Sequence, residues 1–158
     1  EFKGIQRRMT LVDTVNEISV YDDFAHHPTA IATSLDGMRA QMQHSNQTTG
    51  RLIAVFEPRS NTMRLGIHRQ TLPKAFDAAD VVLGFIDPAW RWHLNTDQFK
   101  SEVTLLDSYD KLYQSLLEVC QPQDRIVFMS NGSFGGLHQR LINGLKQKYP
   151  QSSVKGIV

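Results

Sequence analysis

Three short runs of the sequence are almost continuously apolar, and they constrain the fold more than any other feature. They are LIAVF (52–56), DVVLGFI (80–86) and RIVFM (125–129). A strand with one face in water alternates apolar and polar residues, whereas a strand covered on both faces does not. The runs therefore predict central strands of a sheet covered on both faces, and ISVY (18–21) and EVTLL (102–106) are shorter strand candidates.

Helical patterns fill the segments between these runs. Apolar residues spaced by three and four positions predict helices over 31–42, 112–119 and 137–145, and a short helix is predicted over 72–80. Strands that alternate with helices predict an α/β domain with an open, mainly parallel sheet of about six strands and helices on both faces. Ligands of such sheets bind beyond the carboxyl ends of the strands. The tail at 149–158 is a candidate for a final edge strand.

Length and charge narrow the class of protein. A chain of 158 residues suits one domain with one core. Its net charge of +1 gives no drive toward nucleic acid or an anionic membrane surface, and no apolar run approaches the length of a membrane span. The single cysteine, Cys120, excludes an internal disulfide and fits a reducing compartment.

The segment ISVYDDFAHHPTAI (18–31) places titratable residues where a predicted strand ends and a predicted helix begins. Pro28 fits the first turn of a helix and favours an extended conformation at His27. The free N–H groups of the helix N-terminus favour anionic ligand groups. Asp23 can then accept hydrogen bonds from ligand hydroxyls, and His26 or His27 can donate to a phosphate or a carboxylate.

Two other interpretations of this segment stay open. In one, the two aspartates are polar strand-end residues and the histidines lie in solvent. In the other, the segment binds a metal ion. Adjacent histidines in an extended segment point to opposite sides, so both rarely bind one ion. No other group of His and Cys in the sequence has ligand spacing, and no metal ligand is therefore expected.

The segment FEPRSNTMR (56–64) begins at the end of a predicted buried strand. Arg59 would reach into the same crevice, where a guanidinium can bind a carboxylate with two hydrogen bonds. The alternative is a surface arginine that pairs with Glu57. Earlier in the chain, Arg7 and Arg8 could reach a nucleotide, although a solvated charge pair is the commoner role for such residues.

The glycine-rich segment SNGSFGG (130–136) lies between a predicted strand and a predicted helix. Its glycines permit positive φ and a close approach of the backbone to a ligand. It is neither a G-x-G-x-x-G loop, because position 134 is Phe, nor a Walker A loop. The segment is a candidate substrate-contacting loop, and the alternative is a tight strand–helix turn. Trp90 and Trp92 fit either a partly buried site or an exposed recognition surface.

These motifs resemble, in order and spacing, the C-terminal domain of the Mur ligases, the ATP-dependent amide ligases of peptidoglycan assembly. The resemblance rests on F-x-G-x-x-R-R at 2–8, DDFAHHPT at 22–29 and FEPR at 56–59, and it covers essentially the whole chain. FEPRSNTMRLG and MSNGSFGGLHQRL are most similar to the recycling branch of the family. That branch joins L-alanyl-γ-D-glutamyl-meso-diaminopimelate, a murein tripeptide, to UDP-N-acetylmuramate.

The resemblance implies a cytoplasmic enzyme with a UDP-sugar domain, a central P-loop ATPase domain and a Rossmann-like C-terminal domain that closes over both. Residues 1–158 would be the C-terminal domain alone, packed against the ATPase domain in the full chain and inactive by itself. ATP would activate the muramic acid carboxylate as an acyl phosphate, which the peptide amine then attacks. ATP and Mg²⁺ would be bound mainly by the central domain, and no catalytic residue is expected in this chain.

The resemblance also implies roles for individual residues. Arg8 and Asp23 would contact the nucleotide, with Asp23 on the ribose hydroxyls, and His26 would lie near the incoming amino acid. Arg59 matches an arginine of the family member that adds diaminopimelate and is expected to bind a carboxylate of the peptide. The expected substrate-binding residues are His26, His27, Arg59, Asn131, Gly132 and Phe134.

Two departures separate this chain from the L-alanine ligase of the family. That ligase has Tyr where this chain has Phe24, and arginines where this chain has Ser60 and Met63. A free alanine carboxylate would then lack its binding group, whereas the corresponding carboxyl of a tripeptide is an amide and needs none. The L-alanine ligase stays an alternative, as do a non-enzymatic α/β ligand-binding module and, more remotely, a metal-dependent phosphoesterase.

Overall fold

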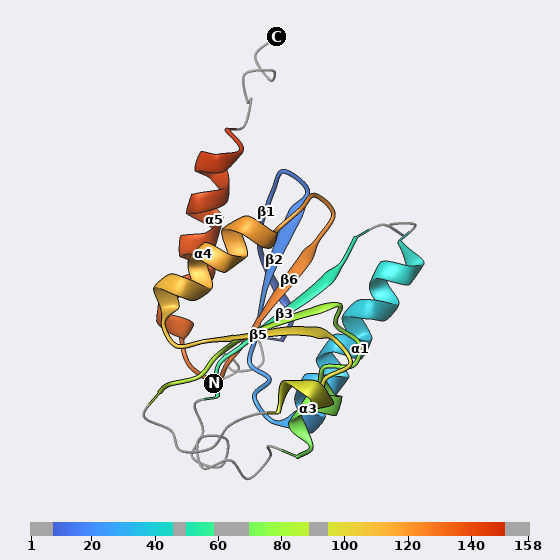
Figure 1. Cartoon of the computed structure of the whole chain (residues 1–158). Coiled ribbons are helices and arrows are strands. Elements are labelled where there is room, and N and C mark those ends of the chain that lie inside the picture. The colour runs from blue at the N-terminus through green and yellow to red at the C-terminus, as the bar shows by residue number, and fades with distance from the viewer. Residues whose placement is uncertain (1–7, 46–49, 59–69, 89–94, 151–158) are drawn as a thin grey trace, which may run out of the picture.

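The computed structural model describes residues 8–45, 50–58, 70–88 and 95–150. These residues form a six-stranded sheet with the strand order β1-β2-β6-β3-β4-β5 (Figure 1). The strands are Thr10–Val15 (β1), Ile18–Asp23 (β2), Leu52–Phe56 (β3), Val81–Phe85 (β4), Glu102–Leu106 (β5) and Arg125–Met129 (β6). All neighbouring pairs are parallel except β1 with β2, which is antiparallel. The mainly parallel α/β sheet expected from the sequence is confirmed.

Helices cover both faces of this sheet. The helices are Pro28–His44 (α1), Leu72–Ala75 (α3), Tyr109–Val119 (α4) and Leu137–Lys148 (α5), and the short 3-10 turns are Thr96–Gln98 (η2) and Phe134–Gly136 (η3). The first two helices lie on one face, and α4 and α5 lie side by side on the other (Figure 1). None of the described helices is long and apolar enough to cross a bilayer.

The central strand β3 shows why the apolar runs are continuous. All five of its residues are buried. Leu52, Ala54 and Phe56 pack in the core cluster that contains the α1 and α3 residues, and Ile53 and Val55 pack in the cluster of α4 and α5. Successive side chains of a strand point to opposite faces, so a strand covered on both faces has no polar position.

Helix α1 begins as its sequence predicts. Pro28 occupies the first turn, and His27 is the extended N-cap with φ −112° and ψ 153°. The predicted apolar face is buried against the sheet, and its residues are Ile31, Leu35, Met38 and Met42.

Two elements differ from the sequence prediction. No strand is predicted over 10–15, yet β1 lies there as an edge strand, and all its residues except Val15 are exposed or partly exposed. The turn that joins it to β2 has positive φ at Asn16 and Glu17, and this two-residue turn lacks a glycine signal. The helix predicted over 72–80 is only the short α3. The strand candidate at 149–158 is described only up to position 150, and its remaining residues lie outside the described ranges.

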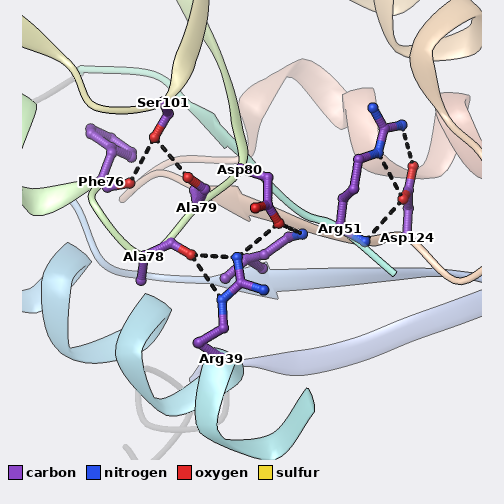
Figure 2. Close-up of polar contacts among 9 residues, drawn as sticks. Arg39, Arg51, Phe76, Ala78, Ala79, Asp80, Ser101 and Asp124 are labelled. Carbon is purple, nitrogen blue, oxygen red and sulfur yellow. Dashed lines mark hydrogen bonds and ion pairs between the residues drawn. The ribbon is translucent and has the colours of Figure 1, made fainter. Parts of the chain in front are cut away.

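Polar residues that directly precede the strands tie the amino edge of the sheet together (Figure 2). Asp124, before β6, is buried and accepts hydrogen bonds from Arg51 Nε at 3.1 Å and Nη2 at 2.7 Å. The hydrogen bond to Asp124 raises the pKa of Arg51. Asp80, before β4, accepts from Arg39 Nη2 of α1 at 2.7 Å. These contacts hold elements together at the edge opposite the one where α/β sheets bind ligands.

Candidate functional site

The carboxyl ends of β2, β6 and β3 lie side by side at one edge of the sheet. Backbone hydrogen bonds continue the pairing past the strands: the Ser130 N–H donates to the Asp23 carbonyl at 3.2 Å, and the Glu57 N–H donates to the Met129 carbonyl at 3.2 Å. The segments that the sequence singled out after each of these strands therefore meet at this edge, as parallel strands require.

A surface hollow of about 200 Å³ lies where β2 ends and α1 begins. It brings together three predicted site residues, Arg8, Asp23 and His26. The other lining residues are Phe24, Ala25, Ala30 and Ser34. The fold therefore places both predicted nucleotide-binding residues and one predicted substrate-binding residue around one space.

Asp23 is held rigidly in this hollow. The residue is only 2% exposed. Its Oδ1 accepts from the Ala25 N–H at 2.8 Å, and its Oδ2 accepts from the Met9 N–H at 3.0 Å. Asp23 thus joins the chain before β1 to the turn before α1, a structural role that the sequence interpretation did not include. Each carboxylate oxygen keeps a second lone pair that can accept from a ligand.

His26 and His27 lie against each other. Their ring centroids are 4.2 Å apart, so the expectation that they point to opposite sides is wrong. The expectation assumed a regular strand, but residues 24–27 lie outside β2, and the Asp23 carboxylate accepts from the Ala25 N–H within this segment. His26 Nδ1 lies 3.0 Å from the Phe24 carbonyl. Because a carbonyl oxygen only accepts, Nδ1 is the donor in this contact.

Glu57 forms a buried polar cluster at the same edge. The residue is 3% exposed. Its Oε1 accepts from the Ser130 hydroxyl at 2.9 Å, and its Oε2 accepts from the Tyr109 hydroxyl. The alternative interpretation, in which Arg59 is a surface arginine that pairs with Glu57, stays open, because Arg59 lies outside the described residues. The sequence signal was present: a glutamate that directly follows a continuous apolar strand is covered by the same layers as the strand.

The loop at 130–136 is compact, and its predicted site residues are not equivalent. Asn131 and Gly132 are partly exposed at the carboxyl edge. Phe134 is 2% exposed and packs edge-on against Phe128, with ring centroids 5.5 Å apart. The prediction that Phe134 contacts substrate is therefore corrected: its side chain belongs to the core under α5. The sequence pattern of an aromatic residue inside a glycine-rich loop does not indicate which way its side chain points.

Arg59, Ser60, Met63, Trp90 and Trp92 lie outside the described residues. Within the described ranges, no three His, Cys, Asp or Glu side chains are placed to hold a metal ion.

The carboxyl end of β5 carries an ion pair in solvent. Lys111 Nζ lies 2.9 Å from Asp107 Oδ1, and both side chains are more than half exposed. The hydrogen bond from Lys111 is the main cause that lowers the pKa of Asp107. Such exposed ion pairs contribute little to the stability of a fold, and we assign Asp107 no role in ligand binding.

A second hollow of about 470 Å³ lies between α1 and α3. Thr29, Thr33 and Asp36 of α1 face Lys74 of α3 across it. None of the described residues that line this hollow is a predicted site residue, and none of them lines the hollow at Asp23.

The comparison with known families identifies the protein family that has this ligand-binding edge. The sequence matches the family described as Mur ligase, glutamate ligase domain, over residues 7–132. The chain belongs to this family. The matched range contains Arg8, Asp23, His26 and Glu57, so the hollow and the buried cluster both lie within the Mur ligase domain.

Two curated relatives of this Mur ligase domain differ in the amine that their names specify. The UDP-N-acetylmuramate–L-alanyl-γ-D-glutamyl-meso-2,6-diaminoheptandioate ligase of Escherichia coli is 39% identical, over 93% of this chain and 32% of that protein. The UDP-N-acetylmuramate–L-alanine ligase of Thermobifida fusca is 31% identical, over 92% of this chain and 33% of that protein. The chain spans about a third of the length of these relatives.

Solved structures of Mur ligases have the same fold. A domain assigned to a UDP-N-acetylmuramate:L-alanyl-γ-D-glutamyl-meso-diaminopimelate ligase of Haemophilus ducreyi aligns with a TM-score of 0.72 and 35% identity, over 87% of this chain and 99% of that one. A murein peptide ligase of Psychrobacter arcticus aligns with a TM-score of 0.76 and 40% identity, over 89% of this chain and 30% of that one.

Proposed function

We propose that this chain forms the C-terminal domain of an ATP-dependent ligase that joins L-alanyl-γ-D-glutamyl-meso-diaminopimelate to UDP-N-acetylmuramate. The muramic acid carboxylate takes the terminal phosphoryl group of ATP, and ADP leaves. The peptide amine then attacks the acyl phosphate carbonyl, and phosphate leaves as the amide bond forms. The observation that carries the proposal is the identity over nearly the whole chain, which is 39% over 93% of it to the E. coli tripeptide ligase and 31% over 92% of it to the T. fusca L-alanine ligase.

The hollow at Asp23 supports a contact with the nucleotide. Arg8 and the N-terminal turn of α1, which carries no acidic side chain, favour an anionic ligand. Asp23 is fixed by two backbone N–H groups and keeps acceptor capacity for ribose hydroxyls. We assign Arg8 and Asp23 to the nucleotide on this basis.

The described carboxylates do not fit a magnesium site. Mg²⁺ needs several oxygen ligands in octahedral geometry. Asp23 and Glu57 are the buried carboxylates at the carboxyl edge, and no three His, Cys, Asp or Glu side chains of the described ranges are placed to hold a metal ion. We therefore place Mg²⁺ and the ATP phosphates on another domain of the full-length protein, with this domain contacting the ribose.

The peptide is proposed to lie across the ends of β2, β3 and β6. His26 lines the hollow at Asp23, and Asn131 and Gly132 are partly exposed at the same edge. His27 lies against His26 and completes this group. Arg59, which follows Glu57 by two positions, is proposed to bind a carboxylate of the peptide.

A substrate comparison tests the proposed function. The full-length protein that contains this chain is assayed for ADP release with ATP, Mg²⁺, UDP-N-acetylmuramate and either the tripeptide or free L-alanine. We expect turnover with the tripeptide and a product of the corresponding mass. Turnover with free L-alanine alone would select the alternative ligase, and turnover with neither amine would support the binding-module interpretation.

The role of Arg59 is tested in the same assay. Arg59→Ala in the full-length protein should raise the KM for the tripeptide about tenfold or more, because a bidentate charged contact is lost. The KM for ATP should stay unchanged. An unchanged tripeptide KM would remove Arg59 from the peptide site and leave the overall function standing.

A further inference from the structure

We propose that Glu57 is a positioning residue that fixes the loop at 130–136 and thereby sets the affinity for the incoming peptide. The inference rests on the proposed function, since it concerns how this domain presents its peptide-binding edge. Three observations carry it: the burial of the Glu57 carboxylate, its contact with the first residue of the loop, and its contact with an aromatic side chain that packs on the far end of the loop.

The burial of Glu57 makes its carboxylate dependent on its partners. Removing a carboxylate from water is costly unless its oxygens receive hydrogen bonds. Glu57 is 3% exposed, and each oxygen accepts from a hydroxyl, one from Ser130 and one from Tyr109. Those hydroxyls come from different parts of the fold, because Ser130 directly follows β6 and Tyr109 is the first residue of α4. The carboxylate therefore links β3, β6 and α4 at the ligand-binding edge.

The contact with Ser130 fixes the start of the loop. The Gly132 N–H donates to Ser130 Oγ at 3.0 Å. The Ser130 hydroxyl has one proton, and Glu57 Oε1 receives it at 2.9 Å. The oxygen of Ser130 is thereby oriented to accept from Gly132, and the backbone between these two residues is held in a turn. Glu57 thus controls the conformation of Asn131 and Gly132 without touching a substrate.

The contact with Tyr109 fixes the end of the loop. The Tyr109 ring packs against Phe134, with centroids 5.9 Å apart. A Cβ atom added at Gly135 would lie 2.5 Å from the Tyr109 ring, so the backbone of Gly135 lies directly on it. Phe134 and Gly135 both have positive φ, a conformation that needs support from its surroundings. The hydrogen bond from the Tyr109 hydroxyl to Glu57 anchors the ring that gives this support.

The chemistry of the cluster requires a carboxylate in place of an amide. Two hydroxyl donors approach the two oxygens from different sides. A glutamine has the same shape but turns an NH₂ donor toward one of the hydroxyls, so one hydrogen bond must be lost or reversed. Glu57→Gln therefore releases one end of the loop while adding no bulk.

The test compares Michaelis constants in the full-length protein. Glu57→Gln should raise the tripeptide KM about tenfold, and the KM values for ATP and UDP-N-acetylmuramate should stay within about twofold of the wild type. Tyr109→Phe removes one hydroxyl and keeps the ring, and it should raise the tripeptide KM as Glu57→Gln does. Ser130→Ala should also raise it, and Ser130→Thr, which keeps a hydroxyl, should restore it toward the wild-type value.

Asp124→Asn is the matched control for a general loss of stability. It removes a buried carboxylate charge at the amino edge, where Arg51 pairs with it, and that edge is remote from the loop. Its melting temperature should fall, and the ratio of the tripeptide KM to the ATP KM should stay at the wild-type value. The positioning role would be overturned if Glu57→Gln left the ratio of the tripeptide KM to the ATP KM at its wild-type value. It would also be overturned if Asp124→Asn changed this ratio as much as Glu57→Gln does.

The outcomes also separate this inference from the proposed function. If the wild-type protein shows no tripeptide-dependent turnover, the proposed function fails and the role of Glu57 falls with it. If the wild type turns over the tripeptide and the Glu57 variants share its KM values, only the positioning role fails. If Glu57→Gln does not fold, Tyr109→Phe decides whether the positioning role holds, because it removes only a single oxygen atom.

Discussion

Two adjacent glycines before α5 show how much a single residue position can depend on its neighbours. Gly135 and Gly136 have φ values of 58° and 71°, a backbone conformation that residues other than glycine adopt only at a cost in free energy. They differ in their surroundings: a Cβ at Gly135 would meet the Tyr109 ring at 2.5 Å, and nothing lies within 4 Å of a Cβ at Gly136. The pair therefore separates backbone strain from steric overlap.

We predict that Gly136→Ala lowers the free energy of unfolding by about 1 kcal/mol, from backbone strain alone. Gly135→Ala should lower it by about 3 kcal/mol, because overlap with the Tyr109 ring adds to the strain. Chemical denaturation of the two variants measures the difference. Equal losses would show that the ring moves away at no cost and that the loop is less tightly held than its contacts indicate.

Cys120 gives a prediction for pH dependence. Burial raises the pKa of its thiol from an ordinary value of 9.0 to about 12. Between these values the unfolded chain loses the proton and the folded chain keeps it, so this group destabilises the fold as pH rises and has no effect below pH 9.0. Wild-type stability should fall with pH more steeply than that of Cys120→Ala, by up to about 1.4 kcal/mol per unit. Urea unfolding at several alkaline pH values measures both slopes, and parallel slopes would contradict the prediction.

At the scale of the elements, α1 is a long helix with a weak point. Gly37 lies in its exposed middle, and a Cβ there would have nothing within 4 Å. Glycine in a helix interior costs about 1 kcal/mol relative to alanine. Gly37→Ala should therefore raise the free energy of unfolding by about 0.5–1 kcal/mol. A thermal melt measures the gain, and a lower melting temperature would show that α1 needs flexibility at this position.

The strands at the two edges of the sheet differ from the central ones for a physical reason. β5 and β1 are the edges, and their side chains are only partly covered. Partial burial weakens the apolar pattern, which is why EVTLL was only a shorter candidate and why β1 was not predicted at all. The central runs were predicted because burial on both faces excludes polar residues from them.

At the scale of the whole molecule, the proposed chemistry needs more than this chain. The described carboxylates form no metal site, and the hollow at Asp23 is about 200 Å³, which suits part of a nucleotide. We predict that residues 1–158 alone release no ADP from ATP with any combination of the substrates, whereas the full-length protein does. An assay of both proteins at equal concentration measures this. ADP release by the isolated chain would place the ATPase chemistry within it.

The sequence by itself determined the class of fold, the central strands, the buried face of α1 and the segments that meet at the ligand-binding edge. These follow from local patterns: continuous apolar runs, helical spacing, and Pro28 at a helix start. The tertiary structure alone decided the direction of individual side chains. It turned Phe134 into the core, brought His26 against His27 and buried Glu57 between two hydroxyls. The directions of Phe134 and His26 and the hydroxyl partners of Glu57 depend on which neighbours from distant segments surround each residue, and no local pattern carries that information.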